Sequence, residues 1–168
     1  MAKTVVRNIG LMLSGKLEEP ILDADCIVAV DGRIVAIGRE GDMDTEGAAT
    51  TVDADGVTLA PGLIDSHVHP VVGDYTPRQQ QLHWIDSTLH GGVTTLISAG
   101  EVHRPGRPND LVGTKALAIA AQRWYENFRP SGMKVHAGAP LLQQGMEEHD
   151  FKEMADAGVT LIGEVGLG

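Results

Sequence analysis

The stretch TLAPGLIDSHVH, from Thr58 to His69, divides the sequence into two parts with different patterns. Its first eight residues, Thr58 to Asp65, are largely apolar and predict a buried strand of the parallel-sheet type. Two histidines separated by one residue, His67 and His69, follow directly. Because side chains i and i+2 of a strand point to the same side, both imidazoles can face one point. The stretch therefore predicts a strand that ends in two potential metal ligands.

Beyond this stretch, strand and helix patterns alternate along the chain. Helices are predicted at 78–90, 110–128 and 147–157, and strands at 93–98, 134–138 and 159–164. Asn109 or Asp110 is placed to cap the second helix, and Gly158 to close the third. Four strands with three helices between them are typical of parallel βαβ units, so we expect an α/β fold.

The segment before the stretch is different in character. Strands are predicted at 4–10, 24–30, 33–38 and 51–53. The pair Asp31-Gly32 separates the second of these strands from the third and is a strong hairpin signal. The segment contains no histidine. Residues 1–58 are therefore expected to form part of a small β-sheet rather than a catalytic unit.

Composition narrows the class of protein. The 168 residues carry a formal net charge of −10, which disfavours nucleic acid and anionic membranes as partners. Hydrophobic residues make up 42% of the chain, yet no apolar run approaches the roughly 20 residues of a membrane span. The single cysteine, Cys26, excludes an intramolecular disulfide and a cysteine-based zinc finger. Since the N-terminus also lacks a signal-peptide pattern, a soluble cytoplasmic protein is expected.

The histidine pair has two interpretations. Neutral imidazoles suit Zn, Fe, Ni or Co, and a metal bound there could activate water. The alternative is that His67 and His69 are packed or solvated at a strand end, which is the commoner situation for an isolated His-x-His pair. Their position just after an apolar strand preceded by Pro61-Gly62 favours the metal site. Active sites of (β/α) barrels lie at such carboxyl ends of strands.

The residues from Pro61 to His69, PGLIDSHVH, resemble the strand-one motif of the amidohydrolase superfamily. Members of that family are metal-dependent hydrolases on a TIM barrel, often flanked by a small β-sandwich formed from both chain termini. The resemblance implies that residues 1–58 are strands of the sandwich. It implies that residues 59–168 are the N-terminal half of a TIM (β/α)8 barrel, with its first four strands and three helices. Because a complete barrel needs about 250 residues, this half would be truncated.

The resemblance also implies a set of metal ligands. Glu164, at the end of the fourth predicted strand, would bridge two divalent ions, Zn and/or Fe, while His67 and His69 hold one of them. An ordinary strand-end salt bridge is the alternative for Glu164. Asp65 would support a ligand from the second shell or cap the following turn. Further histidines and a catalytic aspartate of the family are expected beyond Gly168.

Candidates for substrate contacts are expected at the same edge of the barrel. They are His103, His136, Arg78, Arg104 and Arg107. A guanidinium group binds a carboxylate bidentately, so each arginine is a candidate to pair with an acidic substrate. The alternatives are a structural hydrogen bond for each histidine and simple solvation for each arginine.

Three further stretches, 73–79, 90–100 and 163–168, resemble a branch of the family that acts in nicotinate breakdown. This closer resemblance implies hydrolysis of a cyclic amide, 6-oxo-tetrahydronicotinate, by a metal-activated hydroxide. Ring opening with release of ammonia would give 2-formylglutarate. The alternatives are a dihydroorotase- or hydantoinase-like ring hydrolase, an N-acyl deacetylase and, for the 168 residues alone, an inactive fragment. A small-molecule substrate and a homo-oligomeric full-length protein are expected.

Overall fold

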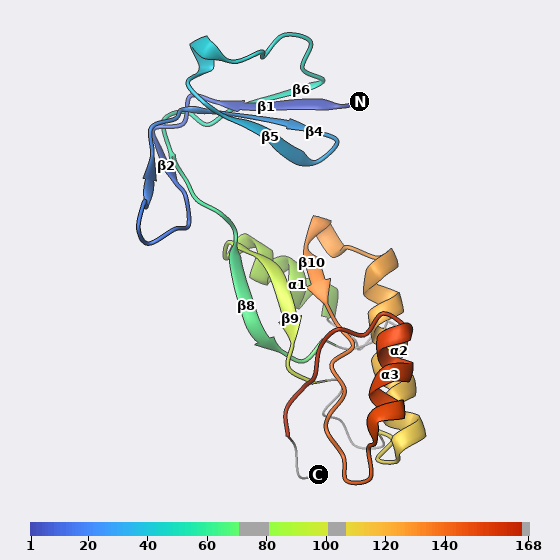
Figure 1. Ribbon diagram of the computed structural model, residues 1–168. Helices are drawn as coiled ribbons and strands as arrows, with labels where there is room; N and C mark the ends of the chain where they lie inside the picture. The colour runs from blue at the N-terminus through green and yellow to red at the C-terminus, as the bar shows by residue number, and fades with distance from the viewer. Residues whose placement is uncertain (71–80, 101–106, 166–168) are drawn as a thin grey trace. The chain divides into compact units, whose positions relative to one another are not determined.

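A computed structural model describes residues 1–70, 81–100 and 107–165 of the chain (Figure 1). The described chain is of the mixed α/β class, as the sequence predicts. It divides into two compact units, Met1–Pro61 and Gly62–Gly168, which are described in turn. Within the described residues, no helix is both long and apolar enough to cross a membrane.

The first unit is built from strands and one short 3-10 helix. Its larger sheet has the order β5-β4-β1-β6, and its smaller sheet has the order β3-β2-β7. The elements are β1 (Lys3–Arg7), β2 (Leu11–Leu13), β3 (Ile21–Leu22), β4 (Cys26–Val30), β5 (Arg33–Gly38), η1 (Glu40–Asp42), β6 (Thr50–Asp53) and β7 (Thr58–Leu59). The sequence does not predict β2 and β3, because two or three residues are too few to show an alternating pattern.

The predicted hairpin joins β4 to β5. Asp31 and Gly32 lie between the two strands with φ values of 49° and 77°. Positive φ at both central positions is what a tight two-residue hairpin turn requires. β4 and β5 pair antiparallel on either side of this turn, which confirms the prediction.

A small apolar core supports the larger sheet. Val5 of β1 and Cys26 and Val28 of β4 are 1%, 0% and 4% exposed. Burial raises the pKa of the Cys26 thiol, and the nearby carboxylates of Glu40 and Asp25 raise it further. The thiol therefore stays protonated and packs as a small hydrophobic side chain.

The apolar run from Thr58 to Asp65 is not one strand, so that prediction is wrong. Its first part is β7, which pairs with β2 in the first unit. Its second part belongs to β8 (Leu63–Val68), which pairs with β9 in the second unit. Pro61 lies between them and has no backbone N–H, so it cannot continue a ladder of hydrogen bonds. The run is interrupted at the boundary between the two units.

The second unit is a three-stranded parallel sheet with helices beside it. β8, β9 (Val93–Ser98) and β10 (Lys134–His136) pair in the order β10-β9-β8. The other elements are α1 (Gln81–His90), α2 (Leu111–Asn127), η2 (Pro130–Gly132) and α3 (Glu148–Asp156). The three predicted helices are confirmed with slightly shorter bounds. The predicted start of the first, at Arg78, lies outside the described residues.

An apolar core lies between this sheet and its first two helices. Leu96 of β9 and Ile85 of α1 are fully buried, and Tyr125 of α2 and Val135 of β10 pack with them. Burying one such large side chain stabilises the fold by about 2 kcal/mol. Because the strands are parallel, their carboxyl ends lie at one edge of the sheet. That edge carries the histidine pair.

The predicted strand at 159–164 is wrong as a regular element. Gly163 N donates to Pro140 O at 2.9 Å, and Glu164 N donates to Ala99 O at 2.6 Å. Glu164 O also accepts from Leu142 N at 3.4 Å, so the segment divides its hydrogen bonds between two neighbours, whereas a parallel ladder repeats its bonds along one. Pro140 also has no N–H with which to return a bond. The segment nevertheless brings Glu164 to the end of β9.

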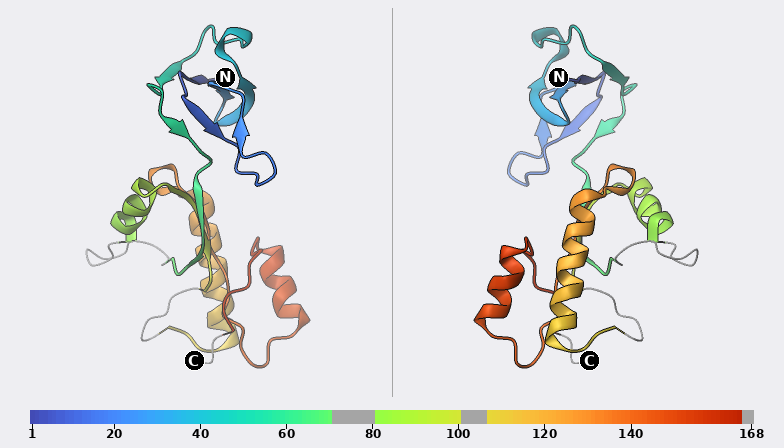
Figure 2. Two further views of the ribbon diagram at one scale, coloured as in Figure 1. Left: turned by 90° about the vertical axis from the view of Figure 1, so that its left-hand side faces the viewer. Right: turned by 90° about the vertical axis from the view of Figure 1, so that its right-hand side faces the viewer.

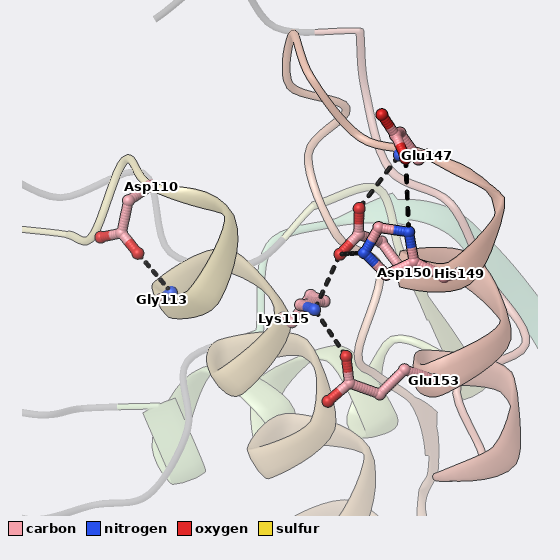
Figure 3. A network of polar contacts seen from close by, with 7 residues as sticks. All are labelled: Asp110, Gly113, Lys115, Glu147, His149, Asp150 and Glu153. Atoms are coloured by element: carbon pink, nitrogen blue, oxygen red, sulfur yellow. Dashed lines mark hydrogen bonds and ion pairs between the residues drawn. The ribbon is translucent and has the colours of Figure 1, made fainter.

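The helices α2 and α3 lie side by side (Figure 2) and are joined by a buried ion pair (Figure 3). Lys115 Nζ lies 2.7 Å from Asp150 Oδ1 and 2.5 Å from Glu153 Oε2. Asp150 is only 2% exposed. Its Oδ2 accepts a hydrogen bond from Glu147 N at 3.0 Å, which forms half of the capping box of α3. One carboxylate therefore both begins α3 and pairs it with α2.

These contacts shift the pKa values of Asp150 and Lys115 in opposite directions. The backbone N–H of Glu147 and the Lys115 ammonium lower the pKa of Asp150 below its ordinary 3.8. Hydrogen bonds to Asp150 and Glu153 raise the pKa of Lys115 above its ordinary 10.5. Stabilisation by the pair is therefore complete at neutral pH. It is lost as the pH falls through the lowered pKa of Asp150, and again as the pH rises through the raised pKa of Lys115.

Replacing Asp150 with Asn should lower the free energy of unfolding near neutral pH, because Lys115 loses its charged partner. The difference from wild type should shrink in acid, where the wild-type carboxylate is also protonated. Urea unfolding at several pH values down to about pH 2 measures both effects. Asp156→Asn is the matched control, since it removes an exposed pair with Lys152 on the same helix and should change stability little. Equal losses in the two variants would contradict this role of Asp150.

Candidate metal centre

Three side chains with metal-binding atoms meet at the end of β8. His67, His69 and Glu164 each offer one ligand atom, and these atoms all lie within 4.8 Å of one another. Glu164 Oε1 is 2.8 Å from His67 Nε2 and 3.7 Å from His69 Nε2. The two imidazole rings are 5.4 Å apart and nearly perpendicular, at 82°. Among the described residues, no other group of His, Cys, Asp or Glu meets this criterion.

An irregularity in β8 shapes the histidine pair. Asp65 is opposite Leu96 of β9, but Val68 is opposite Ser98, so two residues of β8 correspond to one of β9. Asp65 Oδ1 accepts a hydrogen bond from His67 N at 3.0 Å across this bulge. The strand then resumes with Val68, which is buried at 5% exposure between the two more exposed histidines. Val68 points into the core, and the imidazoles on either side of it share the other face.

The ring of His69 is oriented by a backbone carbonyl. His69 Nδ1 lies 3.0 Å from Gly100 O, in the turn that follows β9. A carbonyl oxygen can only accept a hydrogen bond, so Nδ1 carries the proton. In the neutral form of the ring, the lone pair then lies on Nε2, the nitrogen on the side of Glu164. This is the tautomer that a metal ligand needs, with its other ring nitrogen bonded to a carbonyl.

Backbone contacts bring Glu164 to the cluster. Its N–H donates to Ala99 O at 2.6 Å, and its carbonyl accepts from Leu142 N at 3.4 Å. The preceding residue, Gly163, passes close to the turn after β9. A Cβ on Gly163 would lie 2.6 Å from Ala99 O and 2.9 Å from the Cα of Gly100. Glycine at this position therefore permits the approach that places the Glu164 carboxylate beside the imidazoles.

The donor set fits a divalent transition metal. Two imidazole nitrogens and one carboxylate oxygen suit Zn or Fe. Ligands about 2.1 Å from a tetrahedral zinc ion lie about 3.4 Å from each other. The distances of 2.8 and 3.7 Å from Glu164 Oε1 to the two nitrogens bracket that value. The three side chains are therefore arranged to hold one ion with small adjustments.

The structure places two of the five candidate substrate contacts. His136 ends β10 and is partly buried. Arg107 has a buried Nη1 with no hydrogen-bond partner and borders a cavity of about 10 Å³, room for about one water molecule. The cavity is also lined by Pro108, Thr114, Leu117, Pro140, Leu141 and Gln143. Arg78 and His103, like Arg104, lie outside the described residues.

Two residues with structural roles at the cluster are not singled out by the sequence. Ser98 ends β9 with its side chain buried, at 4% exposure, and its Oγ accepts a hydrogen bond from Gly100 N at 3.2 Å. Gly100 in turn bonds His69. The only local signal is a serine at a strand end followed two residues later by glycine. That pattern predicts a turn and gives no indication of a nearby metal site.

Comparison with known proteins shows similarity over the whole chain. Enamidase from Eubacterium barkeri is 55% identical over 168 residues, which are 100% of this chain and 44% of that protein. The crystal structure of enamidase, a member of the amidohydrolase superfamily, matches with a TM-score of 0.90 over 99% of this chain and 43% of that one. The predicted resemblance to the amidohydrolase superfamily is confirmed.

More distant relatives also match most of the chain. Dihydroorotase from Streptococcus pneumoniae is 37% identical over 160 residues, 94% of this chain and 36% of that protein. L-hydantoinase from Paenarthrobacter aurescens is 30% identical over 161 residues, 95% of this chain and 31% of that protein. No family model matches the chain. The chain spans less than half the length of each of these relatives.

The pKa of His136, at the end of β10, can be measured to test the burial of this edge of the sheet. Burial lowers the pKa of His136 from its ordinary 6.5, and the charges of Lys134 and Arg129 lower it further. The imidazole is therefore expected to be neutral at pH 7. A pH titration followed by NMR should give His136 a pKa below 6.5, and Lys134→Gln should move that pKa upward by a small amount. A His136 pKa above 6.5 would contradict the burial seen here.

Proposed function

We propose that this chain, which resembles the amidohydrolase superfamily over its whole length, is part of a metal-dependent hydrolase that opens a cyclic amide. The observation that carries this proposal is the convergence of His67 Nε2, His69 Nε2 and Glu164 Oε1 at the end of β8. The proposed substrate is 6-oxo-tetrahydronicotinate. The 55% identity to enamidase supports this choice over more distant ring hydrolases.

The proposed architecture follows from the same resemblance. Residues 1–58 would contribute strands to a β-sandwich, and residues 59–168 would form the first half of a TIM barrel. The parallel order of β8, β9 and β10 supports this, because successive barrel strands are adjacent and parallel. The position of the cluster also agrees, since barrel active sites lie at the carboxyl ends of strands.

Each side chain of the cluster has a proposed role. His67 and His69 would hold one divalent ion, Zn or Fe, and the Glu164 carboxylate would bridge it to a second. Such ions, when bound, lower the pKa of a water molecule and polarise the amide carbonyl. Asp65 fixes the backbone at His67 through its hydrogen bond of 3.0 Å. The carbonyl of Gly100 fixes the tautomer of His69.

The proposed reaction consumes two water molecules. The first adds to the ring carbonyl carbon, and the ring C–N bond breaks to give a carboxylate and an enamine. The enamine tautomerises to an imine, which the second water converts to an aldehyde and ammonia. The organic product is 2-formylglutarate. The chain's part in this sequence is to orient the ring so that its amide carbonyl faces the cluster and water has access to it.

Arg107 is the described residue best suited to recognise the ring's carboxylate. Its Nη1 is buried and without a hydrogen-bond partner, so pairing it with an anion would satisfy an otherwise costly group. The neutral imidazole of His136 would supply a further polar contact, and His103 and Arg78 remain proposals without a described position. The small-molecule substrate is the only partner that this chemistry requires.

A second ring hydrolase is the alternative. The 37% identity to dihydroorotase and the 30% identity to L-hydantoinase keep a cyclic imide or ureide ring as the alternative to the lactam. All of these rings place a carbonyl next to nitrogen, so the same three ligands serve each of them. The substrate panel described below separates these alternatives.

Replacing His67, His69 or Glu164 with Ala should weaken zinc affinity by about 10-fold to 100-fold or more, because each change removes a ligand. Elemental analysis gives the metal content, and competition with a chelator gives the affinity. His149→Ala is the control, since this histidine lies on α3 with its side chain 71% exposed. An unchanged metal content in Glu164→Ala would contradict the role proposed for that carboxylate.

The hydrolase of which this chain is part should hydrolyse a lactam that carries a carboxylate faster than the same lactam without it. Arg107→Lys keeps the charge but loses the planar fork, so it should raise KM about 10-fold for the acidic lactam and leave the uncharged one unaffected. Arg123→Lys, at an exposed pair with Glu126, is the control. Faster turnover of dihydroorotate, a hydantoin or an N-acyl compound would contradict the lactam proposal and identify that compound class as the substrate. No turnover at all by the 168 residues would identify them as an inactive part of the enzyme.

A further inference from the structure

Ser98 is a buried polar residue at the end of β9 that the proposed chemistry does not use. Its side chain is 4% exposed, and its Oγ accepts a hydrogen bond from Gly100 N at 3.2 Å. The bond spans two residues, as does the bond from His67 N to Asp65 Oδ1 on the neighbouring strand. Each strand therefore has a side chain that bonds the backbone two residues on: Asp65 across the bulge within β8, and Ser98 in the turn that ends β9.

The turn Ser98-Ala99-Gly100 contacts every segment that contributes to the cluster. Ala99 N donates to Val68 O at 2.8 Å, which joins the turn to β8 between the two histidines. Ala99 O accepts from Glu164 N at 2.6 Å. Gly100 O accepts from His69 Nδ1 at 3.0 Å. The relative positions of His69 and Glu164 therefore depend on the conformation of these three residues.

The Ser98 hydroxyl restrains the most adaptable part of this turn. Gly100 has no side chain, so its backbone would otherwise sample many conformations and its carbonyl would point in many directions. The hydrogen bond to Ser98 Oγ fixes the Gly100 N–H and limits the rotation that aims its carbonyl. Because the hydroxyl is buried, water does not readily replace it as a partner for that N–H.

We infer that Ser98 is a positioning residue for the metal centre, acting through the turn Ser98-Ala99-Gly100 on both His69 and Glu164. This inference rests on the proposed metal site. It adds that His69 Nδ1–H is directed at the Gly100 carbonyl before a metal binds, so that Nε2 is the ring nitrogen on the side of Glu164. Ser98 touches neither substrate nor metal in this role, and its effect appears in metal affinity and in the tautomer of His69.

The test compares three variants of the full chain with Zn²⁺ and Co²⁺ as probes. Ser98→Ala removes the hydroxyl and should weaken Zn²⁺ affinity by about 10-fold to 100-fold, with an altered Co²⁺ absorption spectrum. Ser98→Thr keeps the hydroxyl and should restore most of the affinity. Ser14→Ala is the matched control, because Ser14 Oγ accepts from Lys16 N at 2.9 Å in the same type of turn in the first unit. It should bind Zn²⁺ as wild type does.

Equal Zn²⁺ affinity in wild type and Ser98→Ala would overturn the inference. Equal losses of Zn²⁺ affinity in Ser98→Ala and Ser98→Thr would also overturn it, because they would show that Ser98 acts only through its packing. Nitrogen NMR of the metal-free protein gives an independent readout, which also serves if Ser98→Ala fails to fold. Wild type should show His69 protonated at Nδ1, and the opposite tautomer would overturn the inference. If wild type binds no Zn²⁺, the metal proposal fails, and the NMR comparison of wild type with Ser98→Thr and Ser98→Ala still decides the role of Ser98.

Discussion

The parallel pairing of β8 with β9 is the constraint on which the rest of the site depends. It places the carboxyl ends of both strands at one edge, where Ala99 N bonds Val68 O at 2.8 Å. From that point β8 supplies the two imidazoles, and the turn after β9 supplies the carbonyls that bond His69 and Glu164. The buried Leu96 of β9 and its neighbours in the core keep the two strands in register. The backbone pairing therefore sets where the three ligand side chains start, and the contact of His69 Nδ1 with Gly100 O then orients one imidazole.

The pattern of polar and apolar side chains along the sequence predicts the helices and one of the strands. The apolar strand at Val93–Ser98 has the predicted bounds, and the three helices differ from prediction only at their ends. The spacing of His67 and His69 correctly predicts that their rings meet. Glu164 reaches the same point although its segment is not a regular strand. The strand, the helices and the histidine pair follow from local sequence, since hydropathy and the spacing of side chains can be read over a few residues.

The features that the sequence does not predict depend on backbone hydrogen bonds. Hydropathy does not distinguish a continuous strand from one broken at Pro61. Hydropathy describes side chains, whereas the break comes from the backbone N–H that proline lacks. The bulge between Asp65 and Val68 is a property of two paired strands, and it cannot be seen in one strand alone. The segment at 159–164 looks like a strand because it is apolar, yet its partners are Pro140 and Ala99 in separate segments. In each case the local structure depends on which distant segment the backbone pairs with, and the local sequence does not show this.

Charge imposes a further requirement on any acidic substrate. The net charge of −10 repels an anion, although physiological salt limits this repulsion to about 8 Å. Within that range the substrate carboxylate interacts with individual charged groups of the protein. The Glu164 carboxylate would repel it if no metal ion were bound. Metal ions at the cluster would reverse the local sign there and attract the amide carbonyl. Arg107, whose Nη1 is buried without a hydrogen-bond partner, would offer a second positive charge. A ring with a carbonyl and a carboxylate would then be oriented by two separate charges, whereas an uncharged lactam would be oriented by one.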